Sequence, residues 1–213
     1  MVILFPAFQL IFTHMKSTLN QDELLVREFV KRLAPFTEKD WSEFWSRMEP
    51  AEFKKHQFLL KSGEVESYLN FLVSGISRLF YTKAKKEFTI RLIFPGTFFN
   101  SYSSFLNHQP SGYSVEAITD IRLYRMSFEQ LEDLSRASNV APAIAHRALE
   151  HFYMLKEKRE ISLLSNTAEE NYRELLQEQP ELINQIPQKY LASYLGITPQ
   201  SLSRILRTFN PEG

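Results

Sequence analysis

The sequence comprises 213 residues, of which 44% are hydrophobic and 14% aromatic, so it can form one large domain or two small ones with apolar cores. Its 25 acidic and 25 basic residues cancel, which argues against a protein that coats nucleic acid by bulk charge but leaves room for a local basic patch. The sequence contains no cysteine, which excludes disulfides, thiolate catalysis, cysteine-ligated zinc and iron–sulfur clusters within it. A cytoplasmic location is the simplest expectation for such a composition.

The first residues need separate treatment. Residues 1–12 are apolar, but the stretch is too short to span a bilayer and is interrupted by Pro6. It has neither a basic start nor a small-residue cleavage site, so it is a poor signal peptide. Because Met15 has the setting of an ordinary start, we expect residues 1–14 to come from an upstream start codon; a weak membrane-surface anchor is the alternative. We therefore treat residues 1–20 as an uncertain N-terminal extension and expect no membrane partner.

From Gln21 onward, helical spacing of apolar residues predicts one helix over 21–33 and another over 37–48, with Thr37 as its N-cap. Residues 52–126 then change to short strand-like stretches separated by turn signals, which predicts a small antiparallel sandwich or barrel. The basic run over 83–86 is interpreted as a solvated hairpin tip rather than a binding site. The expected strands cover 53–60, 68–73, 76–82, 87–94, 113–117 and 121–126.

After the strands, Ser127 is expected to cap a short helix, and a long helical pattern follows from Ala141 to Leu164. A helix of this length between two domains needs something to cover its apolar stripe, and a second copy of itself is the favoured solution. Packing onto the chain's own sheet is the alternative. A further helix is expected over 167–176. The residues expected in the dimer contact are Ile144, Ala148, Phe152 and Leu155.

The stretch from Pro187 to Arg207 has the pattern of two short helices joined by a tight turn. Pro187 suits the first helical position, and Gly196 can take the left-handed conformation that ends a helix. Thr198 is then a good N-cap for the second helix. Ala192 is the small residue that a close helix crossing requires. This spacing is typical of a helix-turn-helix, although an ordinary helical hairpin covering a core is the alternative.

The second helix of this pair carries polar side chains opposite its apolar stripe. Gln can pair bidentately with adenine and Arg with guanine in the major groove, so Gln200, Ser201 and Arg204 are expected to read bases. The only charged residues from 187 to 209 are basic. The full set expected at DNA, with phosphate contacts by Lys189, Tyr190 and Arg207, is Gln188, Lys189, Tyr190, Thr198, Gln200, Ser201, Arg204 and Arg207.

The order of these parts resembles the Crp/Fnr family of bacterial transcription regulators over roughly 37–207. Three pieces carry the resemblance: Lys61-Ser62-Gly63-Glu64 with the following 71–80 stretch, Phe94-Pro95-Gly96-Thr97-Phe98-Phe99, and the helix-turn-helix. The resemblance implies an α+β fold, with an N-terminal antiparallel β-roll (a double-stranded β-helix, jelly-roll-like) flanked by helices. A long dimerisation helix and a C-terminal all-α helix-turn-helix domain follow, and the sequence stops too soon after its recognition helix for the family's usual β-wing.

The same resemblance divides the chain into four parts. Residues 1–20 are the uncertain extension, and 21–140 form a sensor domain like those that bind cyclic nucleotides. Residues 141–164 form the dimerisation or linker helix, and 165–213 form the DNA-binding domain.

The expected effector segment departs from the family pattern. Relatives that bind cyclic AMP carry Gly-Glu near the start of this segment and Arg-Ser near its end, whereas residues 100–114 contain neither Arg nor Glu. A buried cyclic phosphate without a cation would be poorly compensated, so no cyclic-nucleotide cofactor is expected. An unknown apolar or aromatic effector and simple self-packing are the two interpretations. The candidate pocket residues are Phe99, Ser101, Tyr102, Ser103, Tyr113 and Ser114.

Nothing in the sequence favours an enzyme or a metal site. Its five histidines form no His-x-His pair, and there is no phosphate loop or nucleophile elbow; haem ligation by His56 or His108 is a minor alternative. The predicted function is a homodimeric, sequence-specific DNA-binding transcription regulator. The alternative is a small-molecule sensor that acts through a protein partner. Double-stranded DNA and a second copy of the chain are the expected partners, and RNA polymerase and an unknown small-molecule effector are candidates.

We predict that cyclic AMP and cyclic GMP do not bind tightly, because the 100–114 segment supplies no cation for the phosphate. Isothermal titration calorimetry at micromolar nucleotide should give only the heat of dilution. A saturable binding heat in that range would contradict the prediction.

Overall fold

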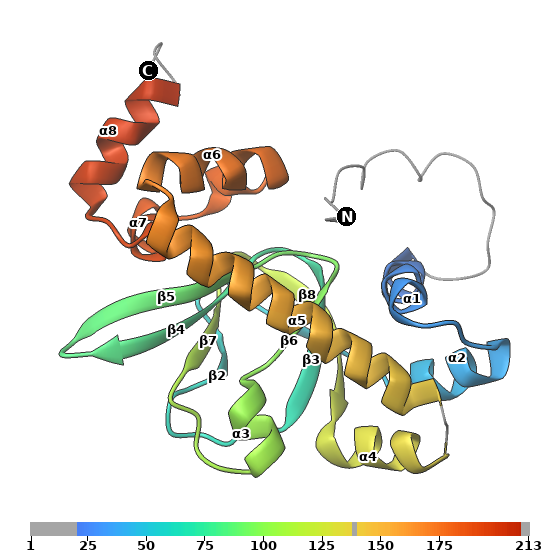
Figure 1. The fold of residues 1–213 in the computed structure, drawn as a ribbon. Helices are drawn as coiled ribbons and strands as arrows, with labels where there is room; N and C mark the ends of the chain where they lie inside the picture. Colours follow the sequence, from blue (N-terminus) through green and yellow to red (C-terminus); the bar gives the residue numbers. More distant parts are fainter. Residues whose placement is uncertain (1–20, 138–139, 210–213) are drawn as a thin grey trace.

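The structure, a computed structural model, describes residues 21–137 and 140–209. Figure 1 shows a β-roll, a long helix α5 (Val140–Ser165) that runs across it, and a small helical domain beyond the far end of α5. The α+β class expected from the sequence is confirmed. The expectations for residues 1–20 lie outside the described residues.

The β-roll consists of two four-stranded antiparallel sheets, with strand orders β1-β8-β3-β6 and β2-β7-β4-β5. Apolar side chains from both sheets meet inside the roll, among them the fully buried Leu72 and Ile93. The strands are β1 (Glu49–Phe53), β2 (Phe58–Leu60), β3 (Tyr68–Ser74), β4 (Ser77–Lys83), β5 (Lys86–Ile93), β6 (Thr97–Phe99), β7 (Ser114–Ala117) and β8 (Ile121–Ser127).

Two strand predictions needed correction. The single strand expected over 53–60 is divided, because β1 pairs with β8 in one sheet while β2 pairs with β7 in the other. His56, with a backbone φ of 70°, lies in the turn between them. The sequence does not predict the short strand β6, because three residues carry no alternation pattern of their own. They form a strand by pairing with β3, where Asn70 lies opposite Phe99.

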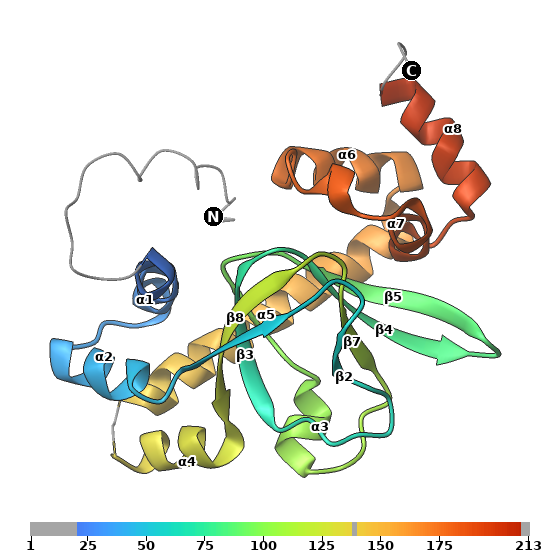
Figure 2. The ribbon, with the colours of Figure 1, turned by 180° about the vertical axis from the view of Figure 1, so that it is seen from behind.

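Helices cover the outer face of the β1-β8-β3-β6 sheet, as Figure 2 shows from behind. Phe29 packs edge-on against Phe71 and Phe98, with ring centroids 5.5 Å apart in both pairs. Thr37 caps its helix as expected, and its hydroxyl accepts from the amide of Asp40 at 3.2 Å. The remaining helices are α1 (Gln21–Leu33), α2 (Glu38–Trp45), α3 (Tyr102–Asn107), α4 (Phe128–Ala137), α6 (Ala168–Glu178), α7 (Gln188–Leu195) and α8 (Pro199–Phe209).

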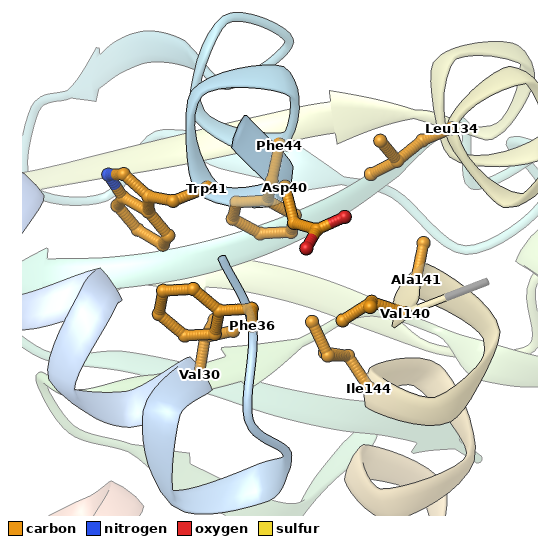
Figure 3. Close-up of a pocket in the computed structure, with 9 residues that line it drawn as sticks. All are labelled: Val30, Phe36, Asp40, Trp41, Phe44, Leu134, Val140, Ala141 and Ile144. Atoms are coloured by element: carbon orange, nitrogen blue, oxygen red, sulfur yellow. The ribbon is translucent and has the colours of Figure 1, made fainter. Parts of the chain in front are cut away.

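The pocket where α1, α2, α4 and α5 meet is a packed core rather than a ligand cavity. Figure 3 shows Val30, Phe44, Leu134 and Ile144 converging on it, and its volume of about 10 Å³ holds at most one water molecule. Its lining is mostly apolar, which is the character of a small dry gap between helices.

The inward face of α5 corrects the predicted dimer contact. Ile144 and Phe152 pack against the core of the β-roll's helical cover, and Ala148 is half-buried on the same side. These side chains cover the chain's own roll, so Ile144 and Phe152 are not free to meet a second copy. The alternative considered from the sequence holds for this face, whereas Leu155 is 41% exposed.

The outward face of α5 is also apolar. Its exposed side chains include Leu149 at 43%, Tyr153 at 68%, Ile161 at 59% and Leu164 at 90% exposure. A helix with apolar residues on all sides is normally covered on all sides, and the described residues cover only one.

Candidate nucleic-acid interface and effector segment

The two C-terminal helices, α7 and α8, are joined by the tight turn that the sequence predicts. Gly196 is left-handed, with φ of 73°, and the amide of Ile197 donates to the carbonyl of Ala192 at 3.0 Å. Thr198 accepts from the amide of Ser201 at 3.2 Å and so caps α8. Ala192 and Leu202 are buried where the helices cross, at 1% and 0% exposure. Local turn chemistry therefore sets the angle between α7 and α8.

The entrance to α7 differs slightly from expectation. Pro187 occupies the N-cap, one position before the helix, and its carbonyl accepts from the amide of Tyr190 at 2.9 Å. A short 3₁₀ helix, Ile183–Gln185, precedes it and was not predicted. Such a turn is common before a helix and carries little sequence signal.

The outer face of α8 brings together the three residues expected to read bases and Arg207, which was expected to contact a phosphate. Gln200, Arg204 and Arg207 are exposed along it, and Ser201 is partly exposed with its hydroxyl 3.1 Å from that of Thr198. Neither arginine forms an ion pair with another described residue, so both guanidinium groups remain available to a ligand. Figure 1 shows α8 projecting from the rest of the molecule.

The remaining predicted DNA contacts lie on α7 or in the turn. Gln188, Lys189 and Thr198 are at least partly exposed, and the Lys189 ammonium lies 4.5 Å from the ring centroid of Tyr190. Tyr190 itself is only 4% exposed, and its hydroxyl donates to Glu116 of β7 at 3.4 Å. The predicted phosphate contact by Tyr190 is therefore corrected, because its side chain is buried against the β-roll.

Tyr190 belongs to a buried cluster centred on Arg78 of β4. The Arg78 guanidinium lies between two aromatic rings, 3.9 Å from the centroid of Phe80 and 3.5 Å from that of Tyr190. Its Nε and Nη2 donate to one carboxylate oxygen of Glu116 at 2.9 and 2.6 Å, and Nη2 also donates to Glu87 at 2.6 Å. Arg78 is 1% exposed, so this is a desolvated ion pair with aromatic faces above and below.

A second set of contacts joins α7 to the edge strand β5. The hydroxyl of Ser193 accepts from the amide of Thr89 at 2.9 Å and donates to the carbonyl of Glu87 at 3.1 Å. Because β5 ends its sheet, these backbone groups have no neighbouring strand, and α7 supplies the missing partners. The helix-turn-helix is thus docked directly on the roll.

The long helix contributes to the same junction. The guanidinium of Arg159 in α5 donates to the carbonyl of Tyr194 in α7 and stacks on its ring at 3.9 Å. Nearby, burial lowers the pKa of Arg91 to about 10, and its Nη2 donates to the hydroxyl of Thr97 at 3.1 Å. Sequence patterns assigned no role to Arg78, Arg91 or Arg159; the only signal for Arg78 was a charge next to the apolar pair Leu79-Phe80 of β4.

The expected effector segment is held together by its own polar groups. The carboxylate of Glu66 accepts from the amides of Ser101 at 3.2 Å and Tyr68 at 3.1 Å. The hydroxyl of Ser104 accepts from the amide of Glu66 at 2.9 Å, and the hydroxyls of Ser101 and Ser111 lie 2.8 Å apart. Burial raises the pKa of Glu66, while the backbone amides oppose that shift. Glu66 was missed because it lies outside the 100–114 segment.

The six candidate pocket residues do not line one cavity. Phe99 is 2% exposed in the core of the roll, Ser101 is equally buried, and Ser114 accepts from the amide of Ser62 at 2.9 Å. By contrast, Tyr102, Ser103 and Tyr113 are exposed on the outside of the segment. Of the two interpretations considered from the sequence, this arrangement favours self-packing.

Two other classes of site find no support in the part of the chain that the structure describes. No group of three His, Asp or Glu side chains there has the geometry to hold a metal ion. No helix within residues 21–137 and 140–209 combines the length and apolarity needed to cross a membrane.

Comparison with known proteins agrees with this architecture. Residues 50–138 match the family model of the cyclic nucleotide-binding domain. The regulator CLP of Xanthomonas campestris, described as responsive to c-di-GMP, is 14% identical with a TM-score of 0.64, over 83% of this chain and 93% of that one. The chain has the Crp/Fnr fold.

Two further structures extend the Crp/Fnr comparison. FixK2 from Bradyrhizobium japonicum is 17% identical with a TM-score of 0.63, covering 78% of this chain and 86% of that one. The catabolite activator protein of Thermus thermophilus is 24% identical with a TM-score of 0.52, covering 87% and 88%. No curated protein sequence matches the chain significantly. The resemblance stated from the sequence is confirmed; CLP is described as a global regulator and the Thermus protein as a catabolite activator.

Replacing Arg78 with Met should release α7 from the roll, because Glu116 would stay buried without its cation. We expect a loss of about 3–5 kcal/mol in the free energy of unfolding, measured by urea denaturation, with faster amide exchange in α7. The matched control is Arg136→Met, whose ion pairs with Glu132 and Asp133 are on the surface and should contribute about 0–1 kcal/mol. Equal losses in the two variants would contradict the central role of Arg78.

Proposed function

We propose that the chain is a homodimeric, sequence-specific DNA-binding transcription regulator of Crp/Fnr type. The observation that carries the proposal is the outer face of α8, where Gln200, Arg204 and Arg207 are exposed on a short helix held by a helix-turn-helix turn. The Crp/Fnr fold of the chain supports it. A DNA-binding role also supports a cytoplasmic location.

In this proposal α8 is the recognition helix and enters the major groove. Gln200, Ser201 and Arg204 read base edges, while Lys189 and Arg207 contact phosphates. Gln188, at the start of the first helix, and Thr198, at the end of the turn, complete the contact surface. Tyr190 makes no contact with DNA in this proposal; its buried hydroxyl donates to Glu116 and holds α7 against the roll.

The charge of this domain is concentrated in one place. Between 168 and 209 there are four basic residues and five acidic ones, but every acidic residue precedes Pro187. The acidic side chains belong to α6 and the turn after it, whereas α7 and α8 carry only positive charge. This division supports an approach of DNA along α7 and α8, away from α6.

The second copy of the chain is proposed to cover the outward face of α5. Leu149, Tyr153, Ile161 and Leu164 form that face, in place of the Ile144 and Phe152 first expected there. Two inverted half-sites about 34 Å apart would then match the two recognition helices. The proposed division is a sensor domain over 21–140, the dimerisation helix over 141–164 and the DNA-binding domain over 165–213.

The sensor domain is proposed to have a degenerate effector segment. The hydroxyls of Ser101, Ser104 and Ser111 are already paired, and the amide of Ser101 already donates to the carboxylate of Glu66, so these groups are not available to a phosphate. A cyclic nucleotide is therefore not the proposed effector. RNA polymerase remains a candidate partner, as in other transcription regulators of this type.

Replacing Arg204 with Ala should remove sequence preference, because a bidentate contact to guanine contributes about 1–3 kcal/mol of discrimination. The measurement is selection of bound sites from a random duplex library at about 150 mM salt, where non-specific binding is weak. The wild type should enrich an inverted repeat. The control is Arg173→Ala on α6, whose guanidinium pairs with Glu169 and should not matter. Enrichment of the same site by the Arg204 variant would contradict base reading by α8.

Placing charges on the outward face of α5 should produce monomers. We expect the double variant Leu149→Glu, Tyr153→Glu to have half the mass of the wild type in light scattering, since two carboxylates would be buried unpaired. Leu106→Glu on α3, where the side chain is 51% exposed, provides the control and should leave the mass unchanged. A dimeric double variant would place the interface elsewhere.

A further inference from the structure

We propose that the tip of the β4–β5 hairpin, residues 83–86, is a second contact to the DNA backbone. The proposal rests on the proposed function and extends it from the helix-turn-helix to the β-roll. Its ligand is double-stranded DNA, recognised through phosphate groups rather than bases. The sequence alone favours a solvated tip, because it does not show that α7 packs against β5 beside this hairpin.

The docking of α7 brings the hairpin to the DNA-binding side. Ser193 of α7 bonds the carbonyl of Glu87, and Glu87 directly follows the basic tip. The same serine lies three positions before Gly196, the turn that leads into the recognition helix. Figures 1 and 2 both show the hairpin projecting beyond the roll on the side where α7 and α8 lie. The tip therefore flanks the start of α8.

The charge of the tip is unopposed. Lys83, Lys85 and Lys86 are all exposed, and none forms an ion pair with another described residue. The nearest acidic side chain in sequence, Glu87, is held at 2.6 Å by Arg78 and so is already compensated. Three ammonium groups without a carboxylate partner on one narrow projection are suited to a line of phosphates, where bound cations displace counterions.

The backbone of the tip is a second, independent observation. Ala84 and Lys85 are both left-handed, with φ of 51° and 64°. Two-residue hairpin turns of this kind normally use Asn-Gly or Asp-Gly, because those residues adopt positive φ with little strain. A lysine at the second position is strained, yet it carries an ammonium group to the apex of the hairpin. Strained residues of this type are concentrated at functional sites.

A phosphate contact at the tip would act independently of sequence. The described residues of α7 and α8 supply three cations, Lys189, Arg204 and Arg207, of which Arg204 is assigned to a base. The three lysines of the hairpin would more than double the phosphate contacts of each protomer, which α7 and α8 supply through Lys189 and Arg207. The expected signature is a steeper salt dependence without a change in the preferred site.

The test compares full-length wild type with the triple variant Lys83→Gln, Lys85→Gly, Lys86→Gln. Gly suits the φ of residue 85, so the variant retains the turn. Fluorescence anisotropy is measured on the selected site and on a random duplex across a salt series. We expect the slope of log K against log salt to become shallower by about 0.9 for each phosphate that the variant no longer neutralises. Affinity should fall roughly tenfold on both duplexes alike, because phosphate contacts carry no sequence information.

Two controls separate charge from folding and from general surface charge. Ala84→Gly relaxes the same turn while keeping every lysine, and Lys31→Gln, Lys39→Gln removes exposed lysines from α1 and α2 at the other end of the molecule. Both should bind DNA like wild type. An unchanged slope in the triple variant overturns the hairpin contact, as does a loss of affinity confined to the selected site. If wild type binds neither duplex at low salt, the proposed function itself fails, and the hairpin contact fails with it.

Discussion

The buried guanidinium of Arg78 is the interaction on which the arrangement of this molecule depends. The guanidinium joins strands β4 and β7 through its hydrogen bonds to Glu116, and it stacks on Tyr190 of α7. The same side chain therefore contacts both the β-roll and the C-terminal helices. A desolvated cation is costly unless both its charge and its N–H groups find partners. Here the carboxylates of Glu116 and Glu87 accept from Nε and Nη2 and two aromatic rings cover the guanidinium, while Nη1 is buried without a hydrogen-bond partner. The pair of helices α7 and α8 is consequently held in a defined orientation relative to the roll.

The two faces of the long helix α5 have different surroundings. Its inner face completes the core of the roll through Ile144 and Phe152, and Arg159 near its end bonds the carbonyl of Tyr194. Its outer face remains apolar and uncovered by the described residues. A helix that contacts both the roll and α7 would transmit a movement of one to the other. Helix α7 thus contacts β5 through Ser193 and α5 through Arg159, so the three elements contact one another.

The 100–114 segment is held by hydrogen bonds among its own side chains and backbone. Residues 50–138 match the cyclic nucleotide-binding domain, yet the 100–114 segment offers no cation and its serines bond to one another and to the backbone. The carboxylate of Glu66 accepts from the backbone amides of Tyr68 and Ser101. Internal hydrogen bonding of this type stabilises the loop without a ligand, because the buried serine hydroxyls are already satisfied; Nδ2 of Asn100 is the exception among the described side-chain polar atoms of the segment, being buried without a partner.

The sequence by itself determined the features that depend on neighbours along the chain. These include the cap at Thr37, the left-handed Gly196 and the polar face of α8, since each follows from turn chemistry or helical periodicity. Only the tertiary structure decided what each buried face contacts. Periodicity identified Phe152 as apolar but did not say whether its partner was a second copy or the chain's own roll. The three-residue strand β6 and the burial of Tyr190 exist because β3 and Arg78, distant in sequence, supply their partners.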